Sequence, residues 1–262
     1  ARLAELLRSV NSYYSNRIEG QHTHPRDIER ALRKNYSKEP DKARRQRVAI
    51  AHIEAQKEME GWLSNEPVEV YAPSFLARLH EAFYRRLKPE DRVMPEGDAV
   101  IPGEWRTRDV DVGKHVPPAH KSIAAFLKRV GECYGDIDGL DGRLIACACA
   151  NHRLAWVHPF RDGNGRVIRL HSHAVLLNMG VGSGLWAVSR GFARNVEAYY
   201  ARLGDADSPR RGDFDGRGNL SEAGLISFAR YFLETCLDQV TFMGEMLALD
   251  QFRERLRGYL IL

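Results

Sequence analysis

Apolar residues recur at every third or fourth position along most of the chain, which is the period of a helix that buries one face. This spacing predicts a mainly α fold. The segment 144–155 is almost wholly apolar, so we expect it to form a helix at the centre of the fold. The other repeats are Val48, Ala51, Ala55, Met59 and Trp62; Leu76, Leu79, Phe83 and Leu87; Ile123, Phe126, Leu127 and Val130; Val167, Leu170, Ala174 and Leu177; and Leu225, Phe228 and Phe232.

The period falls to two in one stretch, "GEWRTRDVDVG", where Trp105, Val110 and Val112 mark the apolar positions. The rigid "VPP" follows it directly. Alternation bounded by turn residues predicts a short β-hairpin. A plain surface hairpin is the simplest interpretation of this segment on its residues alone.

Composition agrees with an ordinary globular protein, since 44% of the 262 residues are hydrophobic and 28% are charged. No run approaches the roughly 18 apolar residues of a membrane span, and no secretory signal opens the chain. We therefore expect a cytoplasmic protein without a membrane partner. The four cysteines lack metal-ligand spacing and are expected to be reduced.

The net charge of +4 is unevenly distributed, because nine basic residues face four acidic ones between Arg26 and Arg47. Such an excess is one mark of a nucleic-acid surface. However, Tyr36 is the only aromatic residue there, and the charges alternate in sign for much of the way. A solvated helix face explains this pattern better, so nucleic acid is not an expected partner.

The nine residues "HPFRDGNGR", 158–166, combine a ring base, a carboxylate and an arginine around two glycines. Pro159 disfavours helical geometry at His158, so the central helix is expected to end there. The sequence "DGNG" predicts a turn that leads into the next helix near Arg166. Backbone N–H groups then point out of the turn and the helix N-terminus, and such an arrangement binds anions.

Arg166 and Arg169 are expected in the first turn of that next helix, where the helix dipole disfavours cations. Being three residues apart, they share one face. Two arginines beside a glycine turn indicate a large anion such as a di- or triphosphate, and Asp162 could hold a Mg²⁺ ion that bridges phosphate oxygens. The structural alternative is that Asp162 pairs with one arginine and His158 caps a helix. The stretch matches neither a P-loop nor a dinucleotide-binding turn.

The longer stretch "HPFRDGNGRVIR" resembles the signature of the Fic family, and every specified position of that signature is filled. The resemblance extends from "SNRIEG" through the hairpin to "AYYARL". It implies a helical bundle with a small β-hairpin flap. It also implies transfer of AMP from ATP to a Tyr, Thr or Ser hydroxyl of a target protein.

The resemblance assigns a role to each residue of the signature. His158 would be the general base, and Asp162 would bind Mg²⁺. The phosphates of ATP would be held by Gly163, Asn164, Gly165, Arg166 and Arg169. Pyrophosphate would leave. In such a reaction, positioning and electrostatic stabilisation supply nearly all of the catalysis.

Two further segments gain a role only from the resemblance. Residues 103–115 resemble the flap that clamps the target segment by strand addition, with the nucleotide near Val112, Gly113, Lys114 and His115. Tyr199 and Tyr200 resemble a tyrosine pair that lines the base pocket, although packing in the core is an equally good interpretation of Tyr199. Where some relatives have Asn, this chain has Asp207, which makes the base contacts less certain than the phosphate contacts.

The N-terminal "SNRIEG" resembles the inhibitory motif of the family. Ser15 and Glu19 are four apart and therefore lie on one helix face. The resemblance implies that Glu19 pairs with Arg169 and misaligns ATP. An ordinary exposed helix with a stray glutamate is the alternative.

We therefore expect an N-terminal helical region over 1–62, a catalytic core over 63–205 and a helical extension over 206–262, with a further module beyond it. Self-modification and a homodimer are consistent with the resemblance. Two other functions remain open. One is removal of AMP, or transfer of another phosphate-linked group, at the same site. The other is a DNA-binding regulatory module with a vestigial site.

Overall fold

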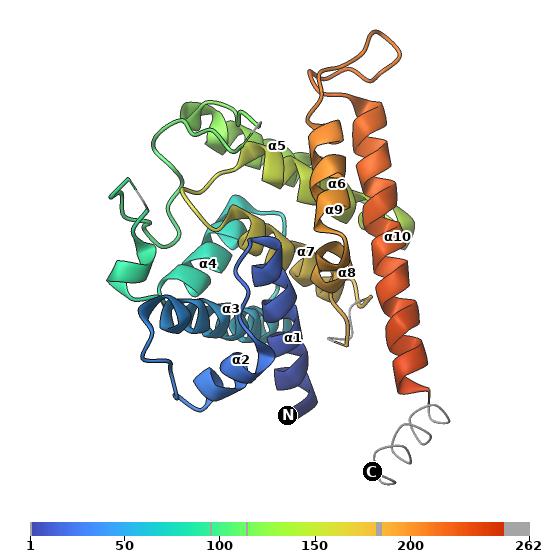
Figure 1. Ribbon diagram of the computed structural model, residues 1–262. Coiled ribbons are helices and arrows are strands. Elements are labelled where there is room, and N and C mark those ends of the chain that lie inside the picture. Colours follow the sequence, from blue (N-terminus) through green and yellow to red (C-terminus); the bar gives the residue numbers. More distant parts are fainter. Residues whose placement is uncertain (1, 95, 114, 182–184, 249–262) are drawn as a thin grey trace.

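Helices dominate the structure, a computed structural model that describes residues 2–94, 96–113, 115–181 and 185–248 (Figure 1). The predicted mainly α fold is confirmed. Short 3₁₀ turns lie at Pro89–Arg92 and His120–Ser122. The α-helices are α1 (Arg2–Ile18), α2 (Pro25–Leu32), α3 (Pro40–Asn65), α4 (Pro73–Tyr84), α5 (Ile123–Tyr134), α6 (Leu140–Val157), α7 (Asn164–Asn178), α8 (Val188–Arg194), α9 (Val196–Ala206) and α10 (Glu222–Leu247).

Helices α6 and α7 form the centre of the bundle. Helix α6 packs between α5, α7 and α10, as its apolar sequence predicts, and α7 contacts α3, α4 and α6. Nearly every residue of α7 is buried, including both arginines near its start. The loop between these two helices is therefore held by the most enclosed part of the fold.

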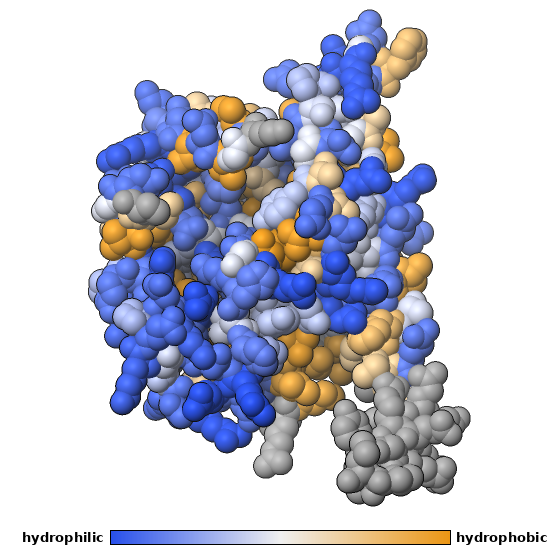
Figure 2. Space-filling view, viewed as in Figure 1, coloured by the Kyte–Doolittle hydropathy of each residue, from blue (hydrophilic) through white to orange (hydrophobic). Residues whose placement is uncertain are grey.

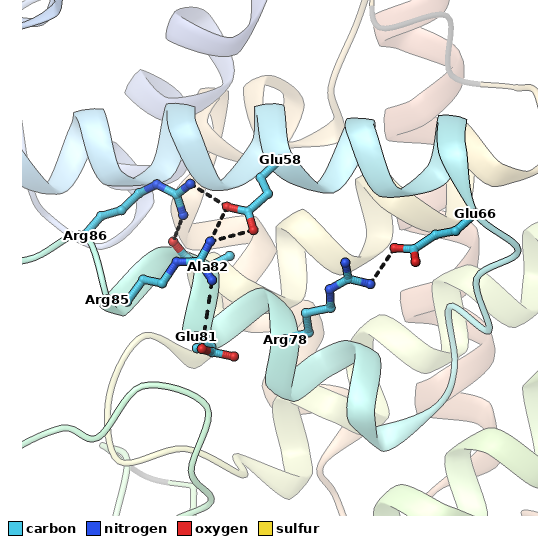
Figure 3. Close-up of polar contacts among 7 residues, drawn as sticks. All are labelled: Glu58, Glu66, Arg78, Glu81, Ala82, Arg85 and Arg86. Atoms are coloured by element: carbon cyan, nitrogen blue, oxygen red, sulfur yellow. Dashed lines mark hydrogen bonds and ion pairs between the residues drawn. The ribbon is translucent and has the colours of Figure 1, made fainter.

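Helix α4 is fixed against α3 by ion pairs along one side (Figure 3). Glu58 of α3 binds Arg85, which follows the last residue of α4, at 2.6 Å, and it also pairs with Arg86. Closer to the start of α4, Arg78 pairs with Glu66 at 2.6 Å and lies over the Trp62 ring. These contacts leave another face of α4 free to meet the loop between α6 and α7.

The hairpin predicted for 103–115 is wrong. Among the described residues of this segment the only ladder contact is an isolated bridge between Val112 and His115. The segment is held by side chains instead. Trp105 packs on Phe160. Arg106 is 4% exposed. Its guanidinium donates to the carbonyls of His158, Arg108 and Pro118. Alternation along the sequence therefore reflected side-chain anchoring and not strand pairing.

Hydrophilic side chains cover α2, and an apolar surface lies beside it between α1 and the C-terminal half of α10 (Figure 2). In the basic segment, Arg33 pairs with Glu29 on an exposed face, whereas Lys42 and Arg47 pair with the buried carboxylates of Asp27 and Asp91. Within the described ranges, no helix has the length and apolar character needed to cross a membrane.

Candidate active site

The loop between α6 and α7 is closed by its own side chains. Helix α6 ends at Val157, as predicted, and His158 has left-handed backbone angles (φ 48°, ψ 61°), which are uncommon for a residue other than glycine. The Asn164 side chain accepts from the Phe160 N–H and donates to the Phe160 carbonyl, both at 2.9 Å. Asn164 therefore closes the loop through its side chain.

His158 is mostly buried, and its electrostatic environment keeps its ring neutral. Burial, followed by the neighbouring His115, lowers the pKa of His158 to about 4. The nearby Ala155 carbonyl raises the pKa and so opposes this shift in part. A neutral imidazole can accept a proton at physiological pH, as a general base requires.

The start of α7 provides donors for an anion. Gly163 precedes the helix with φ +78°, and the backbone turns so that the helix N-terminus opens into the site. Arg166 is 5% exposed, and its Nε and Nη1 have no partner among the described residues. Buried N–H groups of a cation are costly to leave unpaired, so this position fits a bound anion.

Asp162 is the carboxylate of the loop, and it lies 3.6 Å from Arg166 Nη2. Burial opposes its ionisation, but the Arg166 charge and hydrogen bonds from Tyr84 and the Gly163 N–H lower its pKa overall. Within the described residues no group of three or more His, Cys, Asp or Glu side chains could hold a metal ion. One carboxylate fits Mg²⁺ if phosphate oxygens and water supply the remaining ligands.

Arg169 is bound by α1. Its Nε donates to Ser15 Oγ at 3.0 Å, and its Nη2 donates to the Ser15 carbonyl at 2.9 Å and to Glu19 Oε1 at 2.6 Å. The predicted ion pair between Glu19 and Arg169 is therefore confirmed. The sequence predicted Arg169 in the first turn of this helix. Helix α7 begins at Asn164, however, so Arg169 lies in its second turn.

The Glu19 carboxylate also touches the loop backbone. A Cβ placed on Gly165 would collide with Glu19 Oε1. Burial opposes ionisation of Glu19, but the charges of Arg169 and Arg166 outweigh it and lower the pKa. An ionised oxygen therefore lies against the glycine turn that the sequence assigns to phosphate.

The structure gives different surroundings to the predicted base-pocket and flap residues that it describes. Tyr199 is 3% exposed and stacks on Phe192, which agrees with packing in the core. Tyr200 is partly exposed and donates to the Ile18 carbonyl at the end of α1. In the flap, Val112 is exposed, Gly113 has φ +61° and Lys114 lies outside the described residues.

His115 connects the flap to the helices. Its Nε2 is 2.8 Å from the Trp156 carbonyl, and its Nδ1 is 3.3 Å from Asp207 Oδ2. The other oxygen of Asp207 lies 3.0 Å from His152 Nε2. Asp207, the position that departs from the family pattern, therefore links the flap to α6.

Two residues of α4 also contact the loop, and sequence reasoning missed both. His80 is fully buried against Phe160, and Tyr84 donates to Asp162 Oδ2 at 2.6 Å. In the sequence they lie in "LHEAFY", among the apolar positions of an ordinary helix. The signal that was present is a histidine and a tyrosine four residues apart on a helix that is otherwise apolar on that face.

Comparison with known proteins agrees with this geometry. A profile of the family described as "Fic/DOC family" matches residues 71–176, which include α4, the flap, the loop and most of α7. This segment is a Fic/DOC family domain. The family expected from the sequence is confirmed.

Curated relatives match over part of this domain. Protein adenylyltransferase Fic of Culex quinquefasciatus is 34% identical over 90 residues, which cover 34% of this chain and 18% of that protein. Protein adenylyltransferase fic-1 of Caenorhabditis elegans is 30% identical over 120 residues, covering 45% and 24%. The matched segment thus spans about a fifth of the length of these relatives.

Solved structures show the same fold over nearly the whole chain. A Fic family protein from Desulfovibrio desulfuricans G20 has a TM-score of 0.71 at 18% identity, with 92% of this chain and 66% of that chain covered. Fic-1 from C. elegans has a TM-score of 0.60 at 18% identity, with 91% and 63% covered. The Fic-type arrangement of helices therefore extends beyond the segment matched by the family profile.

Proposed function

We propose that this chain is a protein adenylyltransferase that transfers AMP from ATP to a Tyr, Thr or Ser hydroxyl of a target protein, and that Glu19 inhibits it through Arg169. The observation that carries the proposal is the loop 158–169. It combines a neutral, partly buried imidazole with a glycine turn at a helix N-terminus and two buried arginines. The adenylyltransferase names of the curated relatives support the same activity.

In the proposed reaction the target hydroxyl oxygen attacks the α-phosphorus of ATP. His158 accepts the hydroxyl proton, the bond between the α-phosphorus and the bridging oxygen breaks, and pyrophosphate leaves. The N–H groups at the start of α7 and the unpaired nitrogens of Arg166 would stabilise the charge on the phosphates. Mg²⁺ held by Asp162 would neutralise part of that charge when bound.

The contacts of α1 support autoinhibition at this same site. Arg169 is only 2% exposed, and Ser15 and Glu19 occupy the donors on its Nε and Nη2, so this edge of the guanidinium is not available to an outer phosphate. A charge-assisted pair of this kind contributes roughly 1.5–3 kcal/mol, or about tenfold to a hundredfold in rate if it must break first. The unmodified chain should therefore be nearly inactive, and Glu19→Gly should raise AMP transfer, including self-modification, by about that factor.

The test compares three chains, each incubated with α-³²P-ATP and separately with γ-³²P-ATP: the unmodified protein, Glu19→Gly, and Glu19→Gly combined with His158→Ala. Denaturing electrophoresis reads the label. We expect strong label from the α position only, and only in Glu19→Gly. Equal labelling of the unmodified chain and Glu19→Gly would exclude inhibition by Glu19, and label retained from the γ position would indicate transfer of a different phosphate group.

A further inference from the structure

The last turn of α4 contacts the catalytic loop at three points. The His80 ring is stacked between the Phe160 ring, with centroids 3.9 Å apart, and the Tyr84 ring, with centroids 4.4 Å apart. The Tyr84 hydroxyl reaches Asp162, and a Cβ on Gly163 would lie 2.5 Å from the Tyr84 ring. One helical turn thus supports the loop from Phe160 to Gly163.

The hydrogen bonds of His80 define which form of its ring is present. Nδ1 accepts from the Gly103 N–H at 2.9 Å, so it carries no proton, and Nε2 lies 3.3 Å from the Asp162 carbonyl, to which it donates. The bond accepted by Nδ1 requires a ring without a proton on that nitrogen, so His80 is the neutral Nε2–H tautomer. His80 therefore ties the start of the 103–115 segment and the loop to one side of α4.

Tyr84 acts on the carboxylate itself. Its hydroxyl binds Asp162 Oδ2 at 2.6 Å, whereas Arg166 Nη2 approaches the same oxygen only to 3.6 Å. Without the hydroxyl, Asp162 could turn toward Arg166 and form a closer ion pair. The hydrogen bond from Tyr84 therefore keeps Asp162 in its present orientation and prevents a closer ion pair with Arg166.

We propose that Tyr84 is a positioning residue that holds Asp162 in the orientation in which it binds the divalent cation of the nucleotide complex. This inference rests on the proposed function, because it takes Asp162 as the metal ligand. His80 supports Tyr84 through ring stacking and hydrogen-bonds the Asp162 carbonyl, so the two residues fix the carboxylate and the backbone that carries it. Outer partners of this kind typically change metal affinity by about tenfold to a hundredfold.

The test uses Tyr84→Phe, which removes the hydroxyl and keeps the ring in its stack, in the Glu19→Gly chain. The matched control is Tyr71→Phe, since the Tyr71 hydroxyl is also buried and has no partner among the described residues. Asp162→Ala is the reference. Calorimetric titration with α,β-methylene-ATP at a series of MgCl₂ concentrations gives the Mg²⁺ concentration that half-maximally strengthens nucleotide binding. Labelling from α-³²P-ATP over the same series is the second readout.

For Tyr84→Phe we expect the half-maximal Mg²⁺ concentration to rise about tenfold, with labelling restored at saturating Mg²⁺. A half-maximal concentration equal to that of Tyr71→Phe would overturn the inference. So would a lower labelling plateau without a shift along the Mg²⁺ axis, because that would indicate a purely structural role. If Asp162→Ala keeps the Mg²⁺ dependence of its parent, the proposed metal ligand itself is wrong.

Discussion

The α1 segment and helix α4 both contact the segment 158–169, but they contact opposite ends of it and present groups of opposite chemical character. Helix α1 places an anion, the Glu19 carboxylate, against Gly165 and Arg169. Helix α4 supplies a neutral donor, the Tyr84 hydroxyl, to Asp162. The α1 segment therefore supplies a negative charge where a phosphate would bind, and α4 supports the carboxylate that would bind a metal ion.

The difference shows how two similar-looking contacts can have opposite effects on activity. A contact that takes the place of the substrate opposes the reaction, so its loss should activate. A contact that orients a residue for the substrate favours the reaction, so its loss should weaken it. The distances are equal, since both contacts measure 2.6 Å, and only the chemical identity of the partner separates them.

The largest change in labelling should follow substitution of His158, which takes part neither in the α1 contact nor in the α4 contact. In the Glu19→Gly chain, His158→Ala should reduce labelling about 10²–10⁴-fold, because a general base contributes that much. Binding of α,β-methylene-ATP, measured by calorimetry, should stay near that of the parent, since the phosphates are held elsewhere. Retention of near-parental labelling would show that another group takes the proton.

Arg169→Ala sharpens the comparison, because it breaks the same ion pair as Glu19→Gly. It should not activate, since the arginine that α1 blocks is also the proposed ligand of the outer phosphate. We expect labelling at least about tenfold below that of Glu19→Gly, consistent with loss of a charge-assisted contact. Activation to the level of Glu19→Gly would mean that Arg169 serves only to hold α1.

Ser15→Ala should loosen the α1 contact without removing its charge. The change deletes the acceptor of the Arg169 Nε–H and leaves the Ser15 carbonyl and Glu19 in place. A hydrogen bond of roughly 0.5–1.5 kcal/mol corresponds to about a twofold to tenfold rise in labelling. The control is Ser12→Ala on the same helix, whose hydroxyl donates to the Ala49 carbonyl instead. Equal labelling of the two variants would contradict a role for the Ser15 hydroxyl.

The smallest change in labelling should follow a substitution on the side of α4 that faces α3. Glu58→Gln weakens the pairs with Arg85 and Arg86, which are partly exposed, so the melting temperature should fall by about 1–3 °C. Labelling by the Glu19→Gly chain should stay within twofold, because the far face still holds Tyr84 against Asp162. A larger loss of labelling would show that these ion pairs set the position of α4 in the site.

Sequence reasoning located the parts of the site that are contiguous. Residues 158–169 form one stretch, so the end of α6, the turn and the start of α7 could be predicted together. The pair between Glu19 and Arg169 is distant in sequence and was predicted only through the resemblance of "SNRIEG". Periodicity alone could not place α1 on the loop.

The parts that were missed depend on how helices pack. Tyr84 and Asp162 are 78 residues apart, and the spacing within α4 says nothing about which neighbour its polar atoms meet. The hairpin was predicted from alternating residues, but Arg106 and Trp105 anchor the segment to the loop without a partner strand. Asn164 was expected to help hold the phosphates, but the two bonds of its amide to the Phe160 backbone were not predicted.

Because Glu19 lies against Gly165, the proposed inhibitor would belong to the same chain as the site it blocks. A tethered group acts at an effective concentration set by geometry, which reaches about millimolar even for flexible connections. Diluting the protein leaves that concentration unchanged, and raising ATP acts only by competition with it. The resting activity of this chain would therefore be set by how closely α1 is held to the loop and would be the same in a crowded or a sparse cell.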